Sequence, residues 1–218
     1  MEEKILEVQD LSTSFKTERG WLKAIDGVYF DVYSGEMLGI VGESGCGKSV
    51  TSQSILRLYE EKNTTRYSGK VSFDGQNLFE LPEKEMQKIR GQEISMVFQD
   101  ALSSLNPVFT VGNQIMESLR IHQNMGKKEA REKAIDLLDQ VGIPDPQRRF
   151  YQYPFELSGG MRQRVMIAVA LACGPRILIA DEPTTALDVT IQAQIMDLIV
   201  DMNQKLQMGV MLITHDLA

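Results

Sequence analysis

The sequence has little of what disulfide-bonded, metal-binding or membrane-spanning proteins need. Two cysteines and two histidines in 218 residues exclude a disulfide framework and give no zinc-ligand spacing, and they suit a reducing compartment. The longest apolar run, Val165 to Cys173, is far shorter than the roughly 20 residues that cross a bilayer. The N-terminus MEEKILEVQD is acidic and unlike a signal peptide. We therefore expect a cytosolic protein, which can still dock on a membrane protein.

The sequence also lacks an excess of positive charge. Its formal net charge is -7, which argues against general binding to nucleic acid. Any anion site must therefore come from local geometry. The composition, 43% hydrophobic and 24% charged, is typical of a globular protein with a proper core, and the length favours one large domain with a subdomain.

Short apolar runs alternate with helical patterns in the later part of the chain. The predicted strands are KILEVQDL, GVYFDVY, MLGIVG, KVSFDG, EISMVFQ, RILIAD and GVMLITH. The predicted helices are Lys48–Leu58, Val111–His122, Lys127–Val141, Gly160–Cys173 and Val189–Leu206, which carry apolar residues at helical spacing. Alternating strands and helices predict an α/β fold with a mainly parallel sheet.

Two segments depart from this alternation. The first ~35 residues, together with the turn DGQNL and the strands around it, have turn chemistry and no helix, which predicts an antiparallel β element. Residues from about 101 to 160 are mostly helical and lie between two predicted strands. We interpret them as a helical insertion into a sheet domain formed by 1–100 and 161–218.

A glycine-rich loop follows the strand MLGIV and opens a helix. The stretch GESGCGKS, Gly42 to Ser49, fits the G-x-x-x-x-G-K-[ST] phosphate loop in its strand–loop–helix context. Its glycines let backbone N–H groups converge on phosphate oxygens, and the helix start adds positive potential. Lys48 would reach the β- and γ-phosphates, and Ser49 would bind Mg²⁺. Cys46, inside the loop, is interpreted as a tolerated small residue and not as a nucleophile.

Two carboxylates end the buried strand ILIAD. Asp181 and Glu182 follow four apolar residues. Asp181 can hold the Mg²⁺ shell, as expected of a phosphate-loop NTPase. Glu182 can polarise a water against the γ-phosphate. The alternative is a pair of acidic residues at a solvated strand end.

Gln99 and His215 end two further predicted strands, EISMVFQ and MLITH. A lone glutamine is usually a surface amide, and a lone histidine is more often structural. However, the strand of Gln99 is expected to flank the phosphate-loop strand, so that Gln99 contacts Mg²⁺ or water. His215, at the carboxyl end of a parallel strand, would face the same crevice.

A second glycine-rich helix start lies more than a hundred residues after the first. In LSGGMRQRV, Ser158 can cap the helix, and Gly159 and Gly160 free its backbone N–H groups. The alternative is an ordinary helix cap. The phosphate loop already surrounds one nucleotide's phosphates, so this start would serve a second chain's nucleotide in a two-fold dimer.

Taken together, these motifs resemble the nucleotide-binding subunit of ABC transporters. GESGCGKS resembles the Walker A motif, Gln99 the Q-loop, LSGGM the signature, ILIADE the Walker B motif, Thr185-Ala186-Leu187-Asp188 the D-loop and His215 the switch histidine. The resemblance implies a P-loop NTPase (RecA-like) core, ATP and Mg²⁺ as ligands, and an ATP-dependent dimer.

The resemblance also implies a role for each site residue. Catalysis falls to Glu182, His215 and Gln99, and Mg²⁺ binding to Ser49, Gln99 and Asp181. Phe15 sits where the family stacks an aromatic ring on adenine, although Trp21 and Tyr29 are rivals on composition. The nucleotide-binding residues are Phe15, Gly42, Glu43, Ser44, Gly45, Cys46, Gly47, Lys48, Ser49, Val50, Ser158, Gly159 and Gly160.

The stretches FQDALSSLNP and YPFELSGGMRQRV are similar to the dipeptide/oligopeptide/nickel importer ATPases. This implies transmembrane permease subunits contacting residues from about Gln99 to Leu119, a second and often paralogous ATPase, and indirectly an extracytoplasmic binding protein. It also implies a peripheral position on the cytoplasmic face of the inner membrane.

Met161 replaces the usual signature glutamine, as is common in this subfamily. The chain ends three residues after His215, and we interpret it as a fragment. The alternative is a non-transport ABC ATPase of DNA repair, chromosome structure or translation, but the long insertions and zinc modules of those proteins are missing.

Overall fold

The computed structural model describes residues 3–59, 63–100, 104–185 and 187–215. Parts of two motifs, 101–103 and Ala186, lie outside these ranges. The strands are β1 (Lys4–Thr17), β2 (Gly20–Tyr33), β3 (Met37–Val41), β4 (Thr65–Phe73), β5 (Gln76–Asn77), β6 (Ile94–Val97), β7 (Ile177–Asp181) and β8 (Gly209–Thr214). The helices are α1 (Lys48–Ile55), α2 (Glu83–Ile89), α4 (Val111–His122), α5 (Lys127–Gln140), α6 (Pro146–Arg149), the 3₁₀ helix η1 (Pro154–Glu156), α7 (Gly159–Leu171) and α8 (Val189–Leu206).

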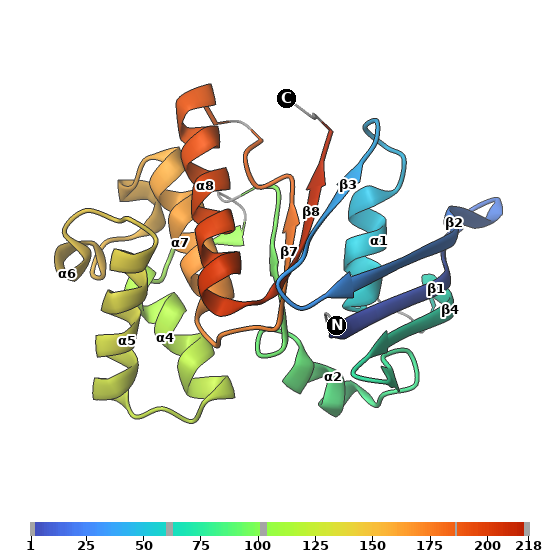
Figure 1. Cartoon of the computed structure of the whole chain (residues 1–218), viewed down its shortest axis with the longest axis horizontal. Helices are drawn as coiled ribbons and strands as arrows, with labels where there is room; N and C mark the ends of the chain where they lie inside the picture. The colour runs from blue at the N-terminus through green and yellow to red at the C-terminus, as the bar shows by residue number, and fades with distance from the viewer. Residues whose placement is uncertain (1–2, 60–62, 101–103, 186, 216–218) are drawn as a thin grey trace.

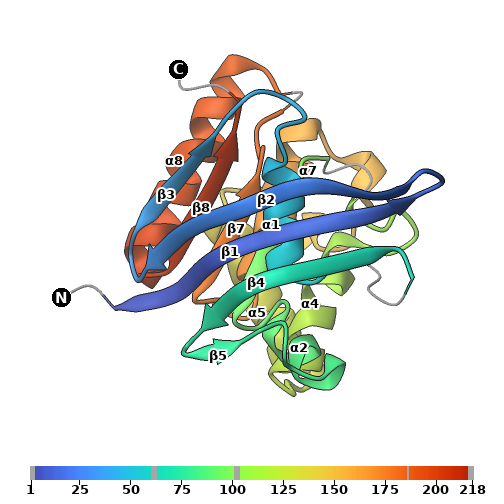
Figure 2. The ribbon, with the colours of Figure 1, turned by 90° about the vertical axis from the view of Figure 1, so that its right-hand side faces the viewer.

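Two four-stranded sheets form the frame (Figures 1 and 2). One is antiparallel, in the order β2-β1-β4-β5, and the other is parallel, in the order β3-β8-β7-β6. The predicted α/β class with an N-terminal antiparallel element is therefore confirmed. The antiparallel sheet is larger than predicted, because β1 and β2 form one long hairpin in which Thr17 Oγ1 donates 2.8 Å to the carbonyl of Gly20.

The prediction that the strand before Gln99 flanks the phosphate-loop strand is wrong. The strand that precedes Gln99, β6, pairs with β7, and two strands separate it from β3. The neighbour of β3 is β8, which is paired in parallel with Met37 opposite Val210. Order within a parallel sheet depends on how the crossover helices pack, which local sequence does not report.

The parallel sheet separates two apolar cores. Along β7, Ile177 and Ile179 belong to the core shared with α1 and the antiparallel sheet, whereas Leu178 and Ala180 belong to the core shared with the helices. Every residue of β7 is buried, as expected of a central parallel strand. Figure 2 shows α1 behind the antiparallel strands, so α1 lies between the two sheets.

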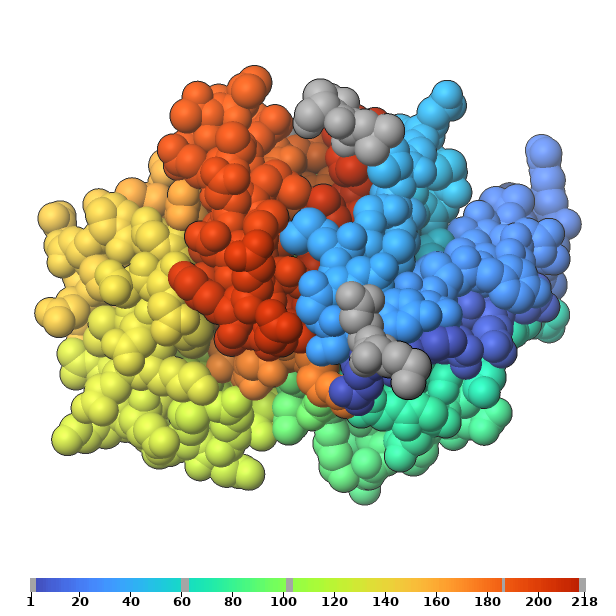
Figure 3. All heavy atoms as spheres, viewed as in Figure 1, coloured from blue at the N-terminus to red at the C-terminus, as the bar shows by residue number. Residues whose placement is uncertain are grey.

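The helical insertion is present between β6 and β7. It contains α4, α5, α6 and η1, and it packs against α7. In the space-filling view (Figure 3), the surface of α8 lies between this helical part and the N-terminal strands. One apolar core joins the helices to the parallel sheet. The predicted boundaries at about 101 and 160 therefore do not separate two independently packed units.

Helix boundaries follow local capping where capping is available. The predicted bounds of α4 and α8 agree with the structure, and the side chains of Thr110 and Asp188 cap these helices by accepting from the amides of Asn113 and Ile191. The predicted helix from Lys48 ends at Ile55, three residues early, because Arg57 has a left-handed backbone with φ 50°. The short helices α2 and α6 were not predicted.

Candidate functional site

The loop at 42–47 joins β3 to α1 and is shaped by close packing. Gly47 has φ +96°, and a Cβ added there would lie 2.5 Å from Cγ2 of Ile25. Both facts exclude a side chain at this position. Gly47 is also the N-cap of α1, and no side chain bonds to that cap. A helix start with uncapped N–H groups is a ready site for an anion.

Lys48 opens α1 and turns its ammonium back into the loop. Its Nζ donates to the backbone carbonyls of Gly42 at 2.6 Å and Glu43 at 2.8 Å. The residue is 8% exposed. The loop therefore holds a fixed cation at the point where the helix dipole is positive, which suits phosphate groups.

The next residue, Ser49, contacts the strand end that carries Asp181. The Ser49 hydroxyl donates to Oδ1 of Asp181 at 3.0 Å, although 132 positions separate the two residues. Asp181 is 2% exposed. Burial raises the pKa of Asp181 above its ordinary value, and the hydrogen bond from Ser49 opposes that shift. A hydroxyl and a carboxylate thus meet beside the phosphate loop.

Glu182 receives three polar contacts on one oxygen. Its Oε2 accepts from Nε2 of Gln99 at 2.9 Å and from the Thr185 hydroxyl at 3.0 Å, and Nδ1 of His215 lies 3.3 Å away. The Glu182 side chain is 13% exposed, and its backbone has φ 45°. The residue after a buried strand thus sits in a strained turn with its carboxylate oriented from three directions.

These side chains, except that of Asp181, line one cavity of about 680 Å³. It joins the phosphate loop to the ends of β6, β7 and β8. Its lining consists of Leu22, Lys23, Ala24, Ser44, Gly45, Gly47, Lys48, Ser49, Val50, Gln99, Glu182, Thr185 and His215. Gln99 and His215 therefore reach the same crevice as the phosphate loop, although β6 does not flank β3.

The loop residue Cys46 lies on a different hollow. It is exposed and lines a second cavity of about 550 Å³, together with residues of β2 and β3. Gly42 and Glu43 take part in the loop through their backbone carbonyls.

Aromatic rings do not line the 680 Å³ cavity among the described residues. Phe15 packs edge-on against Tyr59 with 4.8 Å between ring centroids. Trp21 lies under the guanidinium of Arg66. Tyr29 is exposed and hydrogen bonds to Asp10, which raises the pKa of its phenol. Phe15 is nevertheless the cross-strand partner of Leu22, which does line the cavity.

Ser158, Gly159 and Gly160 lie apart from the phosphate loop. They line a separate cavity of about 590 Å³ with residues of the α8 start, including Leu187 and Asp188. Ser158 Oγ accepts from the amide of Met161 at 3.4 Å, so this is a capped helix start. Within one chain, the two glycine-rich helix starts face different hollows.

Four cavity residues were not predicted as site residues, although Thr185 was named within the D-loop. Leu22, Lys23 and Ala24 come from β2, where register shifts in the hairpin decide which side chains approach the loop. Nothing in their residue types indicates a site. Thr185 gave a signal that could have been used, since a threonine three residues after a carboxylate can bond back to it.

The fold and this cavity define a domain of the phosphate-loop NTPase (nucleoside triphosphatase) type, and comparison places it in a family. Residues 25–185 match the ABC transporter family model, and the chain belongs to that family. Membership implies an ATP-binding domain.

Relatives with curated names are similar over nearly the whole chain. The chain is 55% identical over 215 residues to the dipeptide transport ATP-binding protein DppD of Bacillus subtilis, covering 99% of this chain and 64% of that protein. It is 53% identical over 214 residues to DppD of Escherichia coli, covering 98% and 65%. The chain thus spans just under two thirds of the length of these relatives.

Solved structures show the same fold. The ATP-binding cassette MJ0796, in a dimeric post-hydrolysis state bound to ADP and Pi, has a TM-score of 0.85 and 31% identity, covering 97% of this chain and 88% of that one. CbiO1 of Clostridium perfringens, part of the ABC transporter complex CbiONQ, has a TM-score of 0.80 and 28% identity, covering 99% and 80%. These similarities confirm the predicted family and fold class.

No group of three or more His, Cys, Asp or Glu residues in the described ranges could hold a metal ion by itself. None of the described helices combines the length and the apolar character needed to cross a bilayer.

Proposed function

We propose that this chain binds and hydrolyses ATP as a subunit of an ABC importer of dipeptides, oligopeptides or a related small solute such as nickel. One observation carries the proposal: the phosphate loop with Lys48 and the oriented carboxylate of Glu182 line the same cavity. The first can hold the phosphates, and the second can hold the water that attacks them.

The phosphates of ATP would lie on the 42–47 loop. Uncapped N–H groups at the start of α1 and the Lys48 ammonium, which is held in place by the loop carbonyls, supply the positive charge there. Val50 lines the cavity next to Ser49. The base would approach the wall formed by Leu22 and Ala24, with Phe15 behind Leu22 as the family's expected aromatic partner.

The residues beside the loop fit Mg²⁺. Ser49 and Asp181 offer a hydroxyl and a carboxylate that already touch, and Gln99 offers an amide oxygen on the same cavity. Mg²⁺ prefers such oxygen donors and takes its other ligands from phosphates and water. When bound, the ion would neutralise charge that develops on the phosphates.

Glu182 is the general base in this proposal. Proton transfer needs a carboxylate held within reach of the attacking water. Gln99 and Thr185 donate to one of its oxygens, and His215 lies on the same side. Because these contacts use Oε2, Oε1 is left as the acceptor for the water. While these contacts persist, the amide oxygen of Gln99 would face Mg²⁺ and His215 would assist at the γ-phosphate.

The signature helix start would complete the site of a second chain. Ser158, Gly159 and Gly160 lie on their own cavity, so they would meet nucleotide only across a two-fold interface. The dimeric state of the similar cassette MJ0796 supports this arrangement. ATP would then be part of the interface, and hydrolysis would open it. The partner is a second ATP-binding subunit, either identical or paralogous.

The importer assignment follows the names of the relatives, which are dipeptide transport proteins. These names favour transport over DNA repair or translation. The chain would sit peripherally on the cytoplasmic face of the membrane, bound to permease subunits through residues from about Gln99 to Leu119. It would act indirectly with an extracytoplasmic solute-binding protein.

The test is the oligomeric state and turnover of Glu182→Gln in the full-length protein. We expect this variant to bind ATP, to hydrolyse it at least ~10²-fold more slowly, and to form a dimer by light scattering only with ATP and Mg²⁺. Glu36→Gln is the matched control, because Glu36 accepts from the amide of Tyr33 and is not among the residues that line the cavity. Unchanged turnover in Glu182→Gln would reject the assignment of the base.

A monomer that binds ATP yet never dimerises would reject the homodimer. Adding candidate paralogous ATPases to that sample then tests the heterodimer. If no partner gives an ATP-dependent dimer, Ser158 is only a helix cap.

A further inference from the structure

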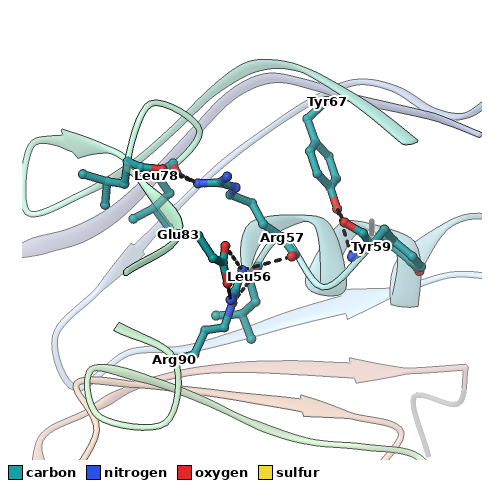
Figure 4. Close-up of polar contacts among 8 residues, drawn as sticks. Leu56, Arg57, Tyr59, Tyr67, Leu78, Glu83 and Arg90 are labelled. Carbon is teal, nitrogen blue, oxygen red and sulfur yellow. Dashed lines mark hydrogen bonds and ion pairs between the residues drawn. The ribbon is translucent and has the colours of Figure 1, made fainter. Parts of the chain in front are cut away.

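Two arginine side chains, Arg57 and Arg90, make hydrogen bonds at the C-terminal end of α1, the helix that follows the phosphate loop (Figure 4). α1 has eight residues and no basic residue in its last turn. The left-handed residue Arg57 follows its C-cap, Leu56, with Arg57 N bonded to the carbonyl of Ser54 and Leu58 N to that of Gln53, each at 3.0 Å. This motif normally takes glycine. An arginine in this conformation is strained, and the contacts of its side chain offset that cost.

The Arg57 guanidinium ties the helix end to the segment between β5 and α2. Nη1 donates to the carbonyl of Leu78 at 3.0 Å and to that of Leu81 at 2.6 Å. The chain beyond the helix is held as well, because the Tyr67 hydroxyl accepts from the amide of Tyr59 and donates to its carbonyl. The exit from α1 is therefore fixed by long-range contacts (Figure 4).

Arg90 bonds to the carbonyl groups at the same helix end. Its Nε donates to Leu56 O at 2.7 Å, its Nη2 donates to Arg57 O at 3.0 Å, and its Nη1 donates to the Glu83 carboxylate. The Arg90 side chain is 23% exposed. A cation here also offsets the negative end of the helix dipole.

Arg90 belongs to the segment that leads to Gln99. It is the C-cap of α2, and the amide of Gly91 bonds to the carbonyl of Ile94 at the start of β6. β6 ends at Val97, two residues before Gln99. One guanidinium thus joins the rear of the helix that carries Lys48 to the strand that presents Gln99.

We propose that Arg90 is a positioning residue of the nucleotide site, fixing α1 relative to β6 so that the phosphate loop and Gln99 keep their mutual geometry. This inference rests on the proposed function. α1 is only about 12 Å long at 1.5 Å per residue, so a tilt at its rear moves Lys48 and Ser49 relative to the Gln99–Glu182 pair. Loop and helix start move as one body, so phosphate binding survives while alignment for hydrolysis is lost.

The test compares four variants of the full-length protein. Arg90→Met removes the guanidinium but keeps an unbranched side chain, and Arg90→Lys keeps the charge but not the planar fork. Glu83→Gln removes the ion pair while leaving both carbonyl contacts. Arg176→Met is the matched control, since Arg176 is a half-exposed arginine that pairs with Asp74 and Glu3 and does not contact α1.

We expect a split between binding and turnover. Arg90→Met should lower kcat by about tenfold or more while the Kd for ATP stays within about threefold, because misalignment of reacting groups affects rate more than affinity. Arg90→Lys should recover part of the loss. Glu83→Gln and Arg176→Met should keep kcat within about twofold. A folded Arg90→Met with wild-type kcat, or one that loses kcat and affinity in parallel, overturns the inference.

Two further measurements keep the inference testable if a variant or the activity fails. If Arg90→Met does not fold, Arg90→Lys takes its place. A wild-type kcat in Arg90→Lys rejects the inference, and so does a loss of kcat equal to that in Arg176→Met. If the wild-type protein hydrolyses no ATP, the proposed function fails. Hydrogen exchange then tests separately whether Arg90 fixes α1 relative to β6. Amides near Leu58 and Gln99 should then exchange about tenfold faster in Arg90→Lys than in Arg176→Met. Equal exchange rates in the two variants would reject this role of Arg90.

Discussion

The carboxylate of Glu182 and the amide of Gln99 lie 2.9 Å apart, although 83 positions separate them in the chain. The contact joins the ends of β6 and β7, which are neighbours in the parallel sheet. The protein's own side chains therefore orient the general base of the proposed mechanism. Preorganised groups of this kind lower a barrier because they do not need to rearrange during the reaction.

Thr185→Val should reduce ATP turnover by about tenfold. The substitution removes one donor to Oε2 of Glu182 while conserving shape, and a hydrogen bond to a charged group contributes about 1.5–3 kcal/mol. The measurement is kcat at saturating ATP. Thr184→Val is the control, because the described contacts of Thr184 use its backbone carbonyl, which the change leaves in place. Equal rates in both variants would mean that Thr185 does not orient the base.

Gly47→Ala should abolish tight nucleotide binding and destabilise the fold by about 1–3 kcal/mol. The new Cβ meets Ile25 at 2.5 Å in a backbone with φ +96°, so the loop must open. Titration with ATP and urea unfolding measure the two effects. Gly39→Ala, in β3, has nothing within 4 Å of its new Cβ and should leave both unchanged. Wild-type affinity in Gly47→Ala would contradict the proposed phosphate loop.

The ion pair of Glu83 with Arg90 should make stability depend on pH in the acid range. The Arg90 guanidinium holds the pKa of Glu83 below its ordinary value. A carboxyl with a lowered folded-state pKa stabilises the fold fully above its unfolded pKa, near ~4.3, and loses that effect as pH falls through the folded pKa. The urea midpoints of wild type and Glu83→Gln should therefore differ at pH 6 and converge below about pH 3. A constant difference at all pH values would exclude the ion pair as its cause.

Only one of the two cysteines should react in the folded protein. Cys46 is exposed and Cys173 is buried, and burial raises the pKa of the Cys173 thiol, which lowers its thiolate fraction at pH 8. A chromogenic disulfide reagent should label one thiol per chain at pH 8, and two after denaturation. The Cys46→Ser variant should show almost no labelling while folded. Rapid labelling of that variant would show that the core around Cys173 opens.

Local motifs in the sequence predict local structure well in this chain. The phosphate loop, the buried strand before Asp181 and the bounds of α4 and α8 all depend on residues close together in sequence, such as the capping side chains of Thr110 and Asp188. The shared crevice of Lys48, Gln99 and His215 also follows, because carboxyl ends of parallel strands lie at one edge of a sheet.

Long-range contacts account for what the sequence did not predict. α1 ends early because Arg57 is held by the carbonyls of Leu78 and Leu81. The cavity wall at Leu22 depends on the hairpin register, which shifts at several points. The position of β6 at the far side of the sheet depends on helix packing. None of these has a signature within a short window of residues.

The pairing of β3 with β8 has a consequence for the order of events during synthesis. Met37 pairs with Val210, whereas the antiparallel sheet is complete by Asn77. Contacts between distant segments form late, because closing a long loop costs entropy before any contact repays it. We expect the N-terminal sheet to fold while the ribosome is still making the helices. The strand that leads into the phosphate loop must wait for the last strand described here, so the nucleotide site assembles only after the helical region between them has emerged.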